Sequence, residues 1–359
     1  MSGTGKRRLA VVLFNLGGPD SLEAVEPFLF NLFNDPAIIG LPWPFRGMVA
    51  KSISRSRREE ASHNYAHMGG ASPLLPETQR QADALAQKLN TTLAGFEVRT
   101  FISMRYWKPF TEDAARAVKD FAPDEIVLLP LYPQYSTTTT GSSVKAWTKA
   151  YRGPGKTHEV CCFFDDASFA AAHARLIRQT FEAGGKPRNL KLLFSAHGLP
   201  EKVIKRGDPY QHQVERTCEA VMRQLGEGWD WGVCYQSRVG PLKWIGPSTP
   251  EAIEAAGAAG KSVLVVPIAF VSEHVETLVE LDRDYGLLAK EKGCPAYLRA
   301  PALGIDEGFV GGLAGLVASA LFKTRCAPGS GACDRGWSKC PYQHGPNQGG
   351  PNQSGEAAA

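Results

Sequence analysis

The chain lacks any long apolar run. No stretch reaches the roughly 18 consecutive apolar residues that a membrane-spanning helix requires. The first eight residues are polar and basic and lead directly into a strand-like segment, without the apolar centre of a signal peptide. We therefore expect a cytoplasmic protein without a membrane-spanning segment.

The chain also has little net charge. Its +4 balance and pI near 8.5 give no indication of a nucleic-acid partner. The sequence shows neither an internal repeat nor a legible oligomer interface. Hydrophobic residues form 43% of the 359 residues, so a sizeable core can form, and the length predicts about two domains.

Short apolar segments alternate with helical ones along most of the chain. Strands are predicted over residues 9–16, 96–103, 125–131, 159–163, 190–194, 231–236, 262–268 and 296–299. This rhythm predicts an α/β fold with two Rossmann-like domains, each a four-stranded parallel sheet flanked by helices. A substrate cleft is expected between them.

Domain boundaries follow from the same pattern and from the composition. We expect the first domain over residues 1–165 and the second over 166–324. A cysteine-bearing extension would occupy 325–342. Residues 343–359 are rich in Gly, Pro, Asn, Gln and Ser, which is typical of a disordered tail.

Residues 38–49 carry proline, glycine and large apolar side chains, so they are poor helix and poor strand. We interpret this segment as an apolar lip that contacts a hydrophobic ligand or the surface of a membrane. The basic residues of 51–58 suit anionic headgroups or ligand carboxylates. The segment therefore also predicts peripheral association with the inner face of the membrane.

The stretch 265–282 runs from a buried strand into a helix. Ser272 is a candidate N-cap. Four acidic residues fall on one helical face at the carboxyl end of the strand, where α/β folds place their sites: Glu273, Glu276, Glu280 and Asp284. This face is either solvated or a track for a cation or for protons, with His274 beside it.

A histidine follows another strand, that of residues 190–194. His197 lies at its carboxyl end and precedes a Gly-Leu-Pro turn, a position that faces the cleft in α/β folds. An unperturbed imidazole titrates near pH 6.5 and can accept a proton at neutral pH. We therefore expect His197 to act as a base.

These segments resemble the ferrochelatase family, whose members insert ferrous iron into a porphyrin to make haem. The resemblance covers nearly the whole folded chain and rests on a series of motifs in the family's order. They are NLGGP at 15–19, Tyr65 with GGASP at 69–73, RY at 105–106, YPQYS at 132–136, TTGSS at 139–143, SAH at 195–197, RGDPY at 206–210, QS at 236–237, GPLKWIGP at 240–247 and SEHVETL at 272–278.

The resemblance implies a porphyrin in the cleft, with His197 and Glu276 facing each other across the macrocycle as ligands of the substrate iron. His274 and Glu280 would stand behind Glu276. Metallation releases two pyrrole protons, so we assign proton abstraction to His197, and proton exit or metal delivery to Glu276 and the acidic face. The reverse assignment is open.

The resemblance further implies a mostly apolar binding site for the macrocycle, because apolar walls can grip and buckle the ring. Its walls would be Leu16, Tyr65, Tyr132, Trp244 and Phe270, with Arg105 as a polar or propionate contact. The lip favours protoporphyrin IX over coproporphyrin.

Three cysteines lie within fifteen residues of the tail, Cys326, Cys333 and Cys340. Thiolates in a cytosolic tail suggest zinc or iron–sulfur, and the resemblance favours a [2Fe–2S] cluster. Cys161 or Cys162 would supply a fourth ligand; on a strand these two side chains point to opposite faces, so only one would serve. Thr137 stands where one branch of the family has a cysteine.

Two other functions fit parts of this pattern. A tetrapyrrole or siderophore binder also has two α/β lobes, but it needs no base opposite a carboxylate and is usually exported. A chelatase for cobalt or nickel would typically be built around histidine pairs. Turnover of a His197→Ala variant separates an enzyme from a binder, and metal preference separates the chelatases.

Overall fold

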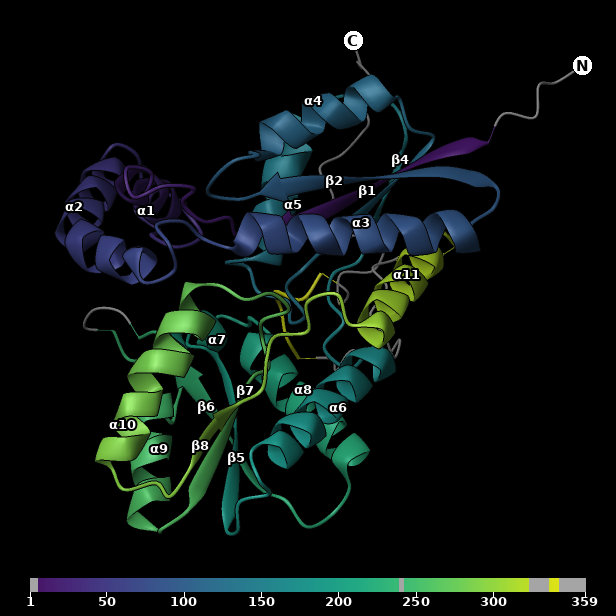
Figure 1. The fold of residues 1–359 in the computed structure, drawn as a ribbon. Helices are drawn as coiled ribbons and strands as arrows, with labels where there is room; N and C mark the ends of the chain where they lie inside the picture. The colour runs from purple at the N-terminus through teal and green to yellow at the C-terminus, as the bar shows by residue number, and fades with distance from the viewer. Residues whose placement is uncertain (1–5, 239–241, 323–335, 342–359) are drawn as a thin grey trace, which may run out of the picture.

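A computed structural model describes residues 6–238, 242–322 and 336–341. In this part of the chain two parallel sheets lie one above the other (Figure 1). The first has the order β2-β1-β3-β4, with β1 Arg7–Asn15, β2 Phe96–Met104, β3 Glu125–Pro130 and β4 Lys156–Glu159. The second has the order β6-β5-β7-β8, with β5 Leu190–His197, β6 Asp230–Gln236, β7 Ser262–Pro267 and β8 Tyr297–Arg299. The predicted fold class is confirmed.

Helices cover both faces of each sheet, as the alternation of side chains along β1 requires. Leu9, Val11 and Leu13 pack on the face covered by α3 Leu74–Thr92 and α11 Glu307–Phe322. The intervening residues pack on the opposite face, under α4 Thr111–Phe121 and α5 Thr140–Ala150.

The second sheet is built in the same way. One face is covered by α6 Ala167–Ala183 and α8 Tyr210–Leu225. The other is covered by α9 Thr249–Ala258 and α10 Tyr285–Glu291. A short helix, α7 Glu201–Lys205, follows β5.

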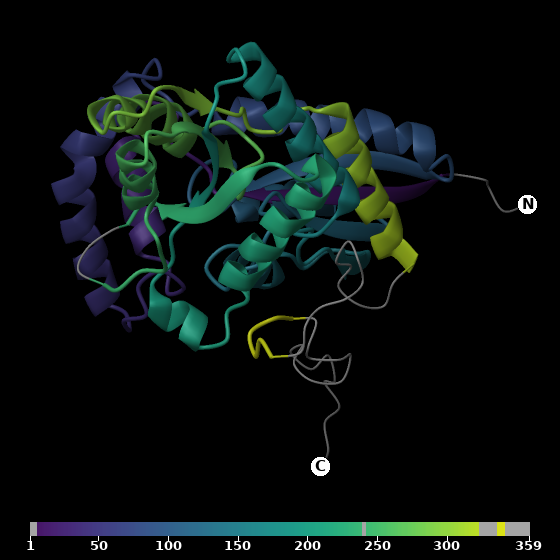
Figure 2. The same cartoon turned by 90° about the horizontal axis from the view of Figure 1, so that it is seen from below.

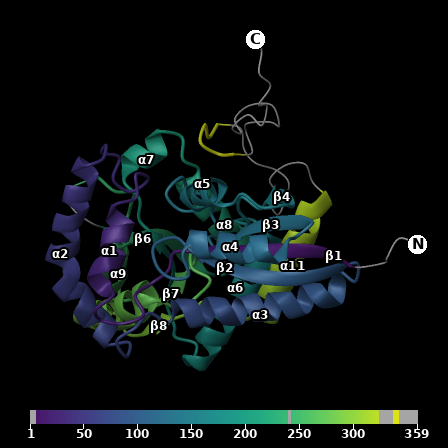
Figure 3. The same ribbon diagram turned by 90° about the horizontal axis from the view of Figure 1, so that it is seen from above.

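Two helices project from the first sheet beside the second half of the molecule, α1 Val25–Phe33 and α2 Phe45–Ala66 (Figure 3). The structure corrects the expectation of an irregular segment at 38–49, because α2 begins at Phe45. The large apolar side chains there are exposed as expected, with Trp43 at 75%, Phe45 at 61% and Met48 at 68%. No helix of the described residues is long and apolar enough to cross a membrane.

Two predicted elements differ from the structure. The strand expected at 159–163 is β4, which ends at Glu159; Val160 to Phe164 continue as buried chain without strand pairing. The helix expected from Glu273 begins later and opens as a π-helix, η1 Glu276–Asp284, before α10. Ser272 is therefore not its N-cap.

The two halves are joined by packing and by hydrogen bonds. The C-terminal helix α11 lies against α6 and against α3 of the first half (Figure 2). Gln81 of α3 donates from Nε2 to the carbonyl oxygens of Val271 and Gly304, and its Oε1 accepts from Ser272 Oγ. These bonds fix the segment that leads from β7 to η1.

Candidate active site

His197 is the last residue of β5, the strand second from one edge of its sheet, and pairs in register with Gln236 of β6. Its carbonyl oxygen accepts a hydrogen bond from the Tyr210 hydroxyl at 3.0 Å, which fixes the backbone at the strand end. Gly198 follows because a Cβ there would lie 2.9 Å from the Gln236 carbonyl oxygen. The imidazole remains 37% exposed, so a ligand in the cleft can reach it.

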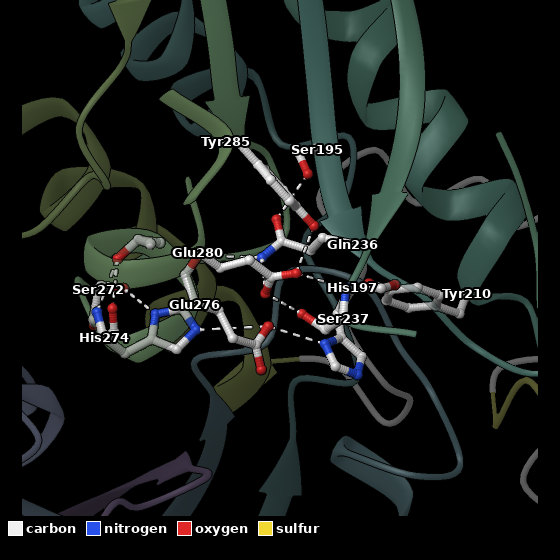
Figure 4. Close-up of polar contacts among 11 residues, drawn as sticks. Ser195, His197, Tyr210, Gln236, Ser237, Ser272, His274, Glu276, Glu280 and Tyr285 are labelled. Atoms are coloured by element: carbon white, nitrogen blue, oxygen red, sulfur yellow. Dashed lines mark hydrogen bonds and ion pairs between the residues drawn. The ribbon is translucent and has the colours of Figure 1, made fainter. Parts of the chain in front are cut away.

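Glu276 lies between two histidines (Figure 4). Its Oε2 is 2.9 Å from His197 Nδ1 and 4.0 Å from His274 Nε2. His274 Nδ1 contacts the Ser272 carbonyl at 3.1 Å, and because a carbonyl only accepts, this nitrogen carries the proton. The unprotonated Nε2 of His274 therefore faces the Glu276 side.

The charges in this group are strongly coupled. Burial by itself lowers the pKa of His197, but the adjacent Glu276 carboxylate outweighs it, so the pKa of His197 is raised. Burial would raise the pKa of Glu276, but the two histidines lower it well below its ordinary value. Burial lowers the pKa of His274, despite the nearby carboxylate. The Glu276 carboxylate therefore makes His197 the more basic of the two histidines, since burial dominates at His274.

Glu280, one turn further along η1, is held by hydrogen bonds. It accepts from the Ser237 backbone N–H at 3.0 Å, from the Ser237 hydroxyl at 2.5 Å, from the Tyr285 hydroxyl at 2.6 Å and from Gln236 Nε2 at 3.2 Å. Burial and the Glu276 charge raise the pKa of Glu280. A raised pKa next to an anion is suitable for passing a proton.

Three of the four predicted acidic residues share the face of η1. Glu276, Glu280 and Asp284 follow one another at intervals of four, which are adjacent positions on a helix. Glu273 is the exception, which corrects the expectation. It precedes the helix and accepts from Arg299 Nη1 at 2.6 Å and from the Ala302 backbone at 2.9 Å.

A mostly apolar cavity of about 200 Å³ lies between the two sheets in front of this group. Six predicted site residues line it, namely Leu16, Tyr132, His197, Phe270, His274 and Glu276. Ile38 of the lip also reaches it. Both halves of the molecule supply apolar wall residues, and the second half also supplies His197, His274 and Glu276.

Four predicted site residues do not line this cavity. Tyr65 is buried against Leu16 and Val275, and Glu280 lies behind Glu276. Trp244 packs against Gly198. Arg105 pairs with buried Asp35 at 2.7 Å and donates to Ser142 Oγ at 2.8 Å.

Sequence reasoning did not assign Asn15, Gln134 or Tyr210, although all three line the cavity. Each lies inside a motif that was noted, at 15–19, 132–136 and 206–210, so motif membership was the available signal. His197 and Glu276 are in direct contact in this structure. Their opposition across a macrocycle stays a prediction.

The cysteine predictions are tested only in part, because Cys326 and Cys333 lie outside the described residues. Cys161 and Cys162 are buried after β4, with their Sγ atoms 3.3 Å apart. This corrects the expectation that they point to opposite faces of a strand. Cys340 is buried, and Cys161 is disulfide-bonded.

The thiols of Cys162 and Cys340 lie near each other. Burial raises the pKa of the Cys162 thiol, and the nearby Cys340 adds to that effect. Within 6–238, 242–322 and 336–341, no group of three or more His, Cys, Asp or Glu side chains is arranged to hold a metal ion.

Comparison with known proteins places this site in a family. The sequence profile described as Ferrochelatase matches residues 8–321. The chain belongs to the ferrochelatase family. It is 60% identical to the ferrochelatase of Phenylobacterium zucineum over 94% of this chain and 99% of that one, and 56% identical to that of Caulobacter vibrioides over the same shares.

Structural comparison agrees on the fold. A multi-domain protein from Deinococcus radiodurans, described as structurally similar to chelatases, superimposes with a TM-score of 0.51 at 14% identity, over 91% of this chain and 56% of that one. Membership in the ferrochelatase family makes this chain an enzyme, a metal chelatase that inserts ferrous iron into a porphyrin to give haem.

Proposed function

We propose that His197 accepts the pyrrole protons when ferrous iron enters protoporphyrin IX, and that Glu276 with Glu280 carries protons or iron to and from the ring. The observation that supports this assignment is the 2.9 Å contact between His197 Nδ1 and Glu276 Oε2 at the wall of an apolar cavity. Such a contact orients the imidazole, so its Nε2 is available to a ligand.

The proton balance of the reaction explains why these groups are needed. Two pyrrole N–H bonds break as the four ring nitrogens bind the cation, and both protons leave the ring. His197 takes a proton in its neutral form, and Glu276 stabilises the imidazolium that results. Glu280, with its raised pKa, is suited to pass protons onward from Glu276. Imidazole and carboxylate are also ligands that ferrous iron tolerates.

The macrocycle would lie against Leu16, Tyr132 and Phe270. The cavity of about 200 Å³ is smaller than the roughly 300–1,000 Å³ typical of small-molecule sites, so porphyrin binding requires the walls to separate. Tyr65 and Trp244 would act from behind the wall. Arg105 would contact a propionate after giving up part of its contact with Asp35.

An anaerobic assay with protoporphyrin IX and ferrous iron tests the proposal. We expect haem formation, followed by porphyrin absorbance, to disappear in His197→Ala while porphyrin binding by fluorescence quenching persists. Unchanged turnover in a folded His197→Ala variant would refute the role of His197. Tight porphyrin binding without metal insertion by the unaltered protein would instead indicate a binder.

We also propose a [2Fe–2S] cluster held by thiolates that include Cys340 and Cys162; Cys161 would serve only after reduction of its disulfide bond. The proposal is supported by the buried thiols of Cys162 and Cys340. Cysteine thiolates are the usual ligands of such clusters. When bound, the cluster would add a redox-active group away from the cavity.

The cluster is testable by iron and sulfide analysis and by the visible spectrum of the protein as isolated. Cys340→Ser and Cys162→Ser should lose the broad visible bands. Cys294→Ser is the matched control, since that thiol donates to the Ile253 carbonyl in a different part of the fold, and it should keep them. A colourless unaltered protein purified anaerobically would contradict the cluster.

The exposed lip supports a further proposal, peripheral attachment to an anionic membrane. Trp43, Phe45 and Met48 present apolar surface beside the basic start of α2. Vesicles with anionic lipid should co-sediment the protein and shift the Trp fluorescence. Trp43→Ser with Met48→Ser should weaken both effects, and equal binding by that variant would exclude the lip.

A further inference from the structure

Two exposed histidines stand together at the C-terminal end of α2. His63 and His67 are four residues apart, so they lie on one face of the helix. Their Nε2 atoms are 3.0 Å apart, and their ring planes are inclined at 87°. The mechanism described above uses neither residue.

The separation of the two nitrogens suits chelation. With metal–nitrogen bonds of about 2.0–2.1 Å and bond angles between roughly 90° and 110°, two coordinated nitrogens lie about 2.9–3.4 Å apart. Histidines at i and i+4 are also the spacing with which a single helix supplies two ligands to a divalent cation. Only small side-chain rotations are needed, because both imidazoles are exposed and free to adjust.

The pair lies beside η1. Tyr65, between the two histidines in sequence, packs in one cluster with Val275, which directly precedes η1. Arg283 and Asp284 lie close enough to affect the pKa of His67. Partial desolvation, Arg283 and His63 lower that pKa, and Asp284 opposes them.

Carboxylates continue inward from this point. Asp284 is exposed, Glu280 is half-buried, and Glu276 is 21% exposed beside the cavity. The three follow one another along one face of η1. A cation bound at the surface therefore has oxygen ligands at each successive turn towards His197.

We propose that His63 and His67 form a docking site for a hydrated first-row divalent cation, ferrous iron in the reaction, at the outer end of the Asp284–Glu280–Glu276 row. This inference rests on the proposed role of that row. With two protein ligands and the remaining positions filled by water, the site binds loosely enough to release its cargo. The cation exchanges imidazole for carboxylate ligands as it moves inward.

A plain hydrogen bond between two neutral imidazoles would give the same 3.0 Å distance. The two interpretations differ in their response to metal. If the pair is only hydrogen-bonded, substituting both histidines leaves the number of bound cations unchanged. If the pair is a docking site, the same substitution lowers that number by one.

The first measurement is an anaerobic calorimetric titration with ferrous iron alone, repeated with Co²⁺, on the full chain without porphyrin. We expect the double variant His63→Ala with His67→Ala to bind one cation fewer than the unaltered protein, and each single variant to bind it at least tenfold more weakly. Asn64→Ala, on the same turn, is the matched control and should bind as the unaltered protein does. Circular dichroism checks that each variant is folded.

The second measurement is steady-state kinetics. In the double variant the KM for ferrous iron should rise about five- to thirtyfold, with kcat at saturating iron and the KM for porphyrin unchanged. Equal stoichiometry and affinity in the double variant would overturn the site. A lost cation with an unchanged KM for iron would overturn its role in delivery. If the unaltered protein made no haem, the titration would still decide the site by itself.

Discussion

The strands β1 and β5 occupy the same place in their two sheets, yet their last residues differ in exposure and in their partners. Asn15 ends β1 and is 6% exposed; its Nδ2 donates to Thr78 Oγ1 at 2.9 Å, and its Oδ1 accepts from the Leu16 backbone at 2.8 Å. His197 ends β5, is 37% exposed and contacts Glu276. Topology brings both side chains to the cleft, but only an exposed ionisable residue with a charged partner can carry proton chemistry.

The neighbouring strands repeat this contrast. β3 and β7 both end in proline, Pro130 and Pro267. The chain after β3 supplies neutral wall residues such as Tyr132, whereas the chain after β7 runs on to His274 and Glu276. Both halves therefore contribute to the wall of the cleft, and the second half adds the groups suited to proton chemistry.

Substitution of the two strand ends tests this comparison most strongly. His197→Ala should lower kcat by about 10²–10⁴-fold, the usual contribution of a general base, with little loss of stability. Asn15→Ala should cost about 1–3 kcal/mol of unfolding free energy, because it leaves Thr78 and the Leu16 N–H with unmade hydrogen bonds. The fold-loss of kcat in Asn15→Ala should be at least tenfold smaller than that in His197→Ala. Similar kcat losses in the two variants would break the comparison.

The pH profile sharpens the role of Glu276. The proton-accepting form of His197 is neutral and exists above its pKa, which Glu276 raises. Activity should therefore fall as the pH drops through a value above the ordinary histidine pKa. Glu276→Gln removes the charge, lowers that pKa and should move the acid limb of kcat/KM to lower pH. Asp284→Asn, at the exposed end of η1, should leave the limb in place, and an unmoved limb in Glu276→Gln would argue against the pairing.

Gln81 tests whether the first half of the molecule holds the catalytic segment of the second. Gln81→Ala leaves two carbonyl oxygens and the Ser272 hydroxyl without their partner, so the free energy of unfolding should fall by about 1–3 kcal/mol. Chemical denaturation measures this change. Gln79→Ala on the exposed face of the same helix should change it by less than about 0.5 kcal/mol. Equal losses of unfolding free energy in the two variants would show that Gln81 does not connect the two halves.

Leu16 tests the apolar wall. Leu16→Ala should raise the KM for porphyrin about five- to thirtyfold, corresponding to about 1–2 kcal/mol of lost apolar contact. The kcat should change less, because an apolar side chain takes no part in proton transfer. Steady-state kinetics at saturating iron measures both, and a fall in kcat with an unchanged KM would contradict a binding role.

The strand–helix rhythm was sufficient to predict both sheets, because parallel strands buried on both faces are continuous apolar runs in the sequence. It was wrong at residues 160–163, which are equally apolar and buried but leave the ladder with β3 after Val160 donates to the Leu128 carbonyl. An apolar sequence pattern indicates that a segment is buried. Strand pairing depends in addition on the path that the segment takes beside its neighbours in the fold.

The site was predictable where its side chains follow strands and motifs, as His197 does. It was not predictable where a distant residue determines the role. Ser272 donates a hydrogen bond to Gln81 instead of capping a helix. Glu273 pairs with Arg299, and Arg105 pairs with Asp35. These partners are distant in the sequence, so the local sequence does not predict them.

The packing of α11 has a consequence for how the chain folds as it is synthesised. Phe309, Leu313 and Val317 complete the core around Leu9 and Val11, which are synthesised well before them. One face of the first sheet therefore stays incompletely covered until α11 has been synthesised. Domains generally fold as units in order of synthesis, but here the N-terminal half should need protection by chaperones until α11 packs against it.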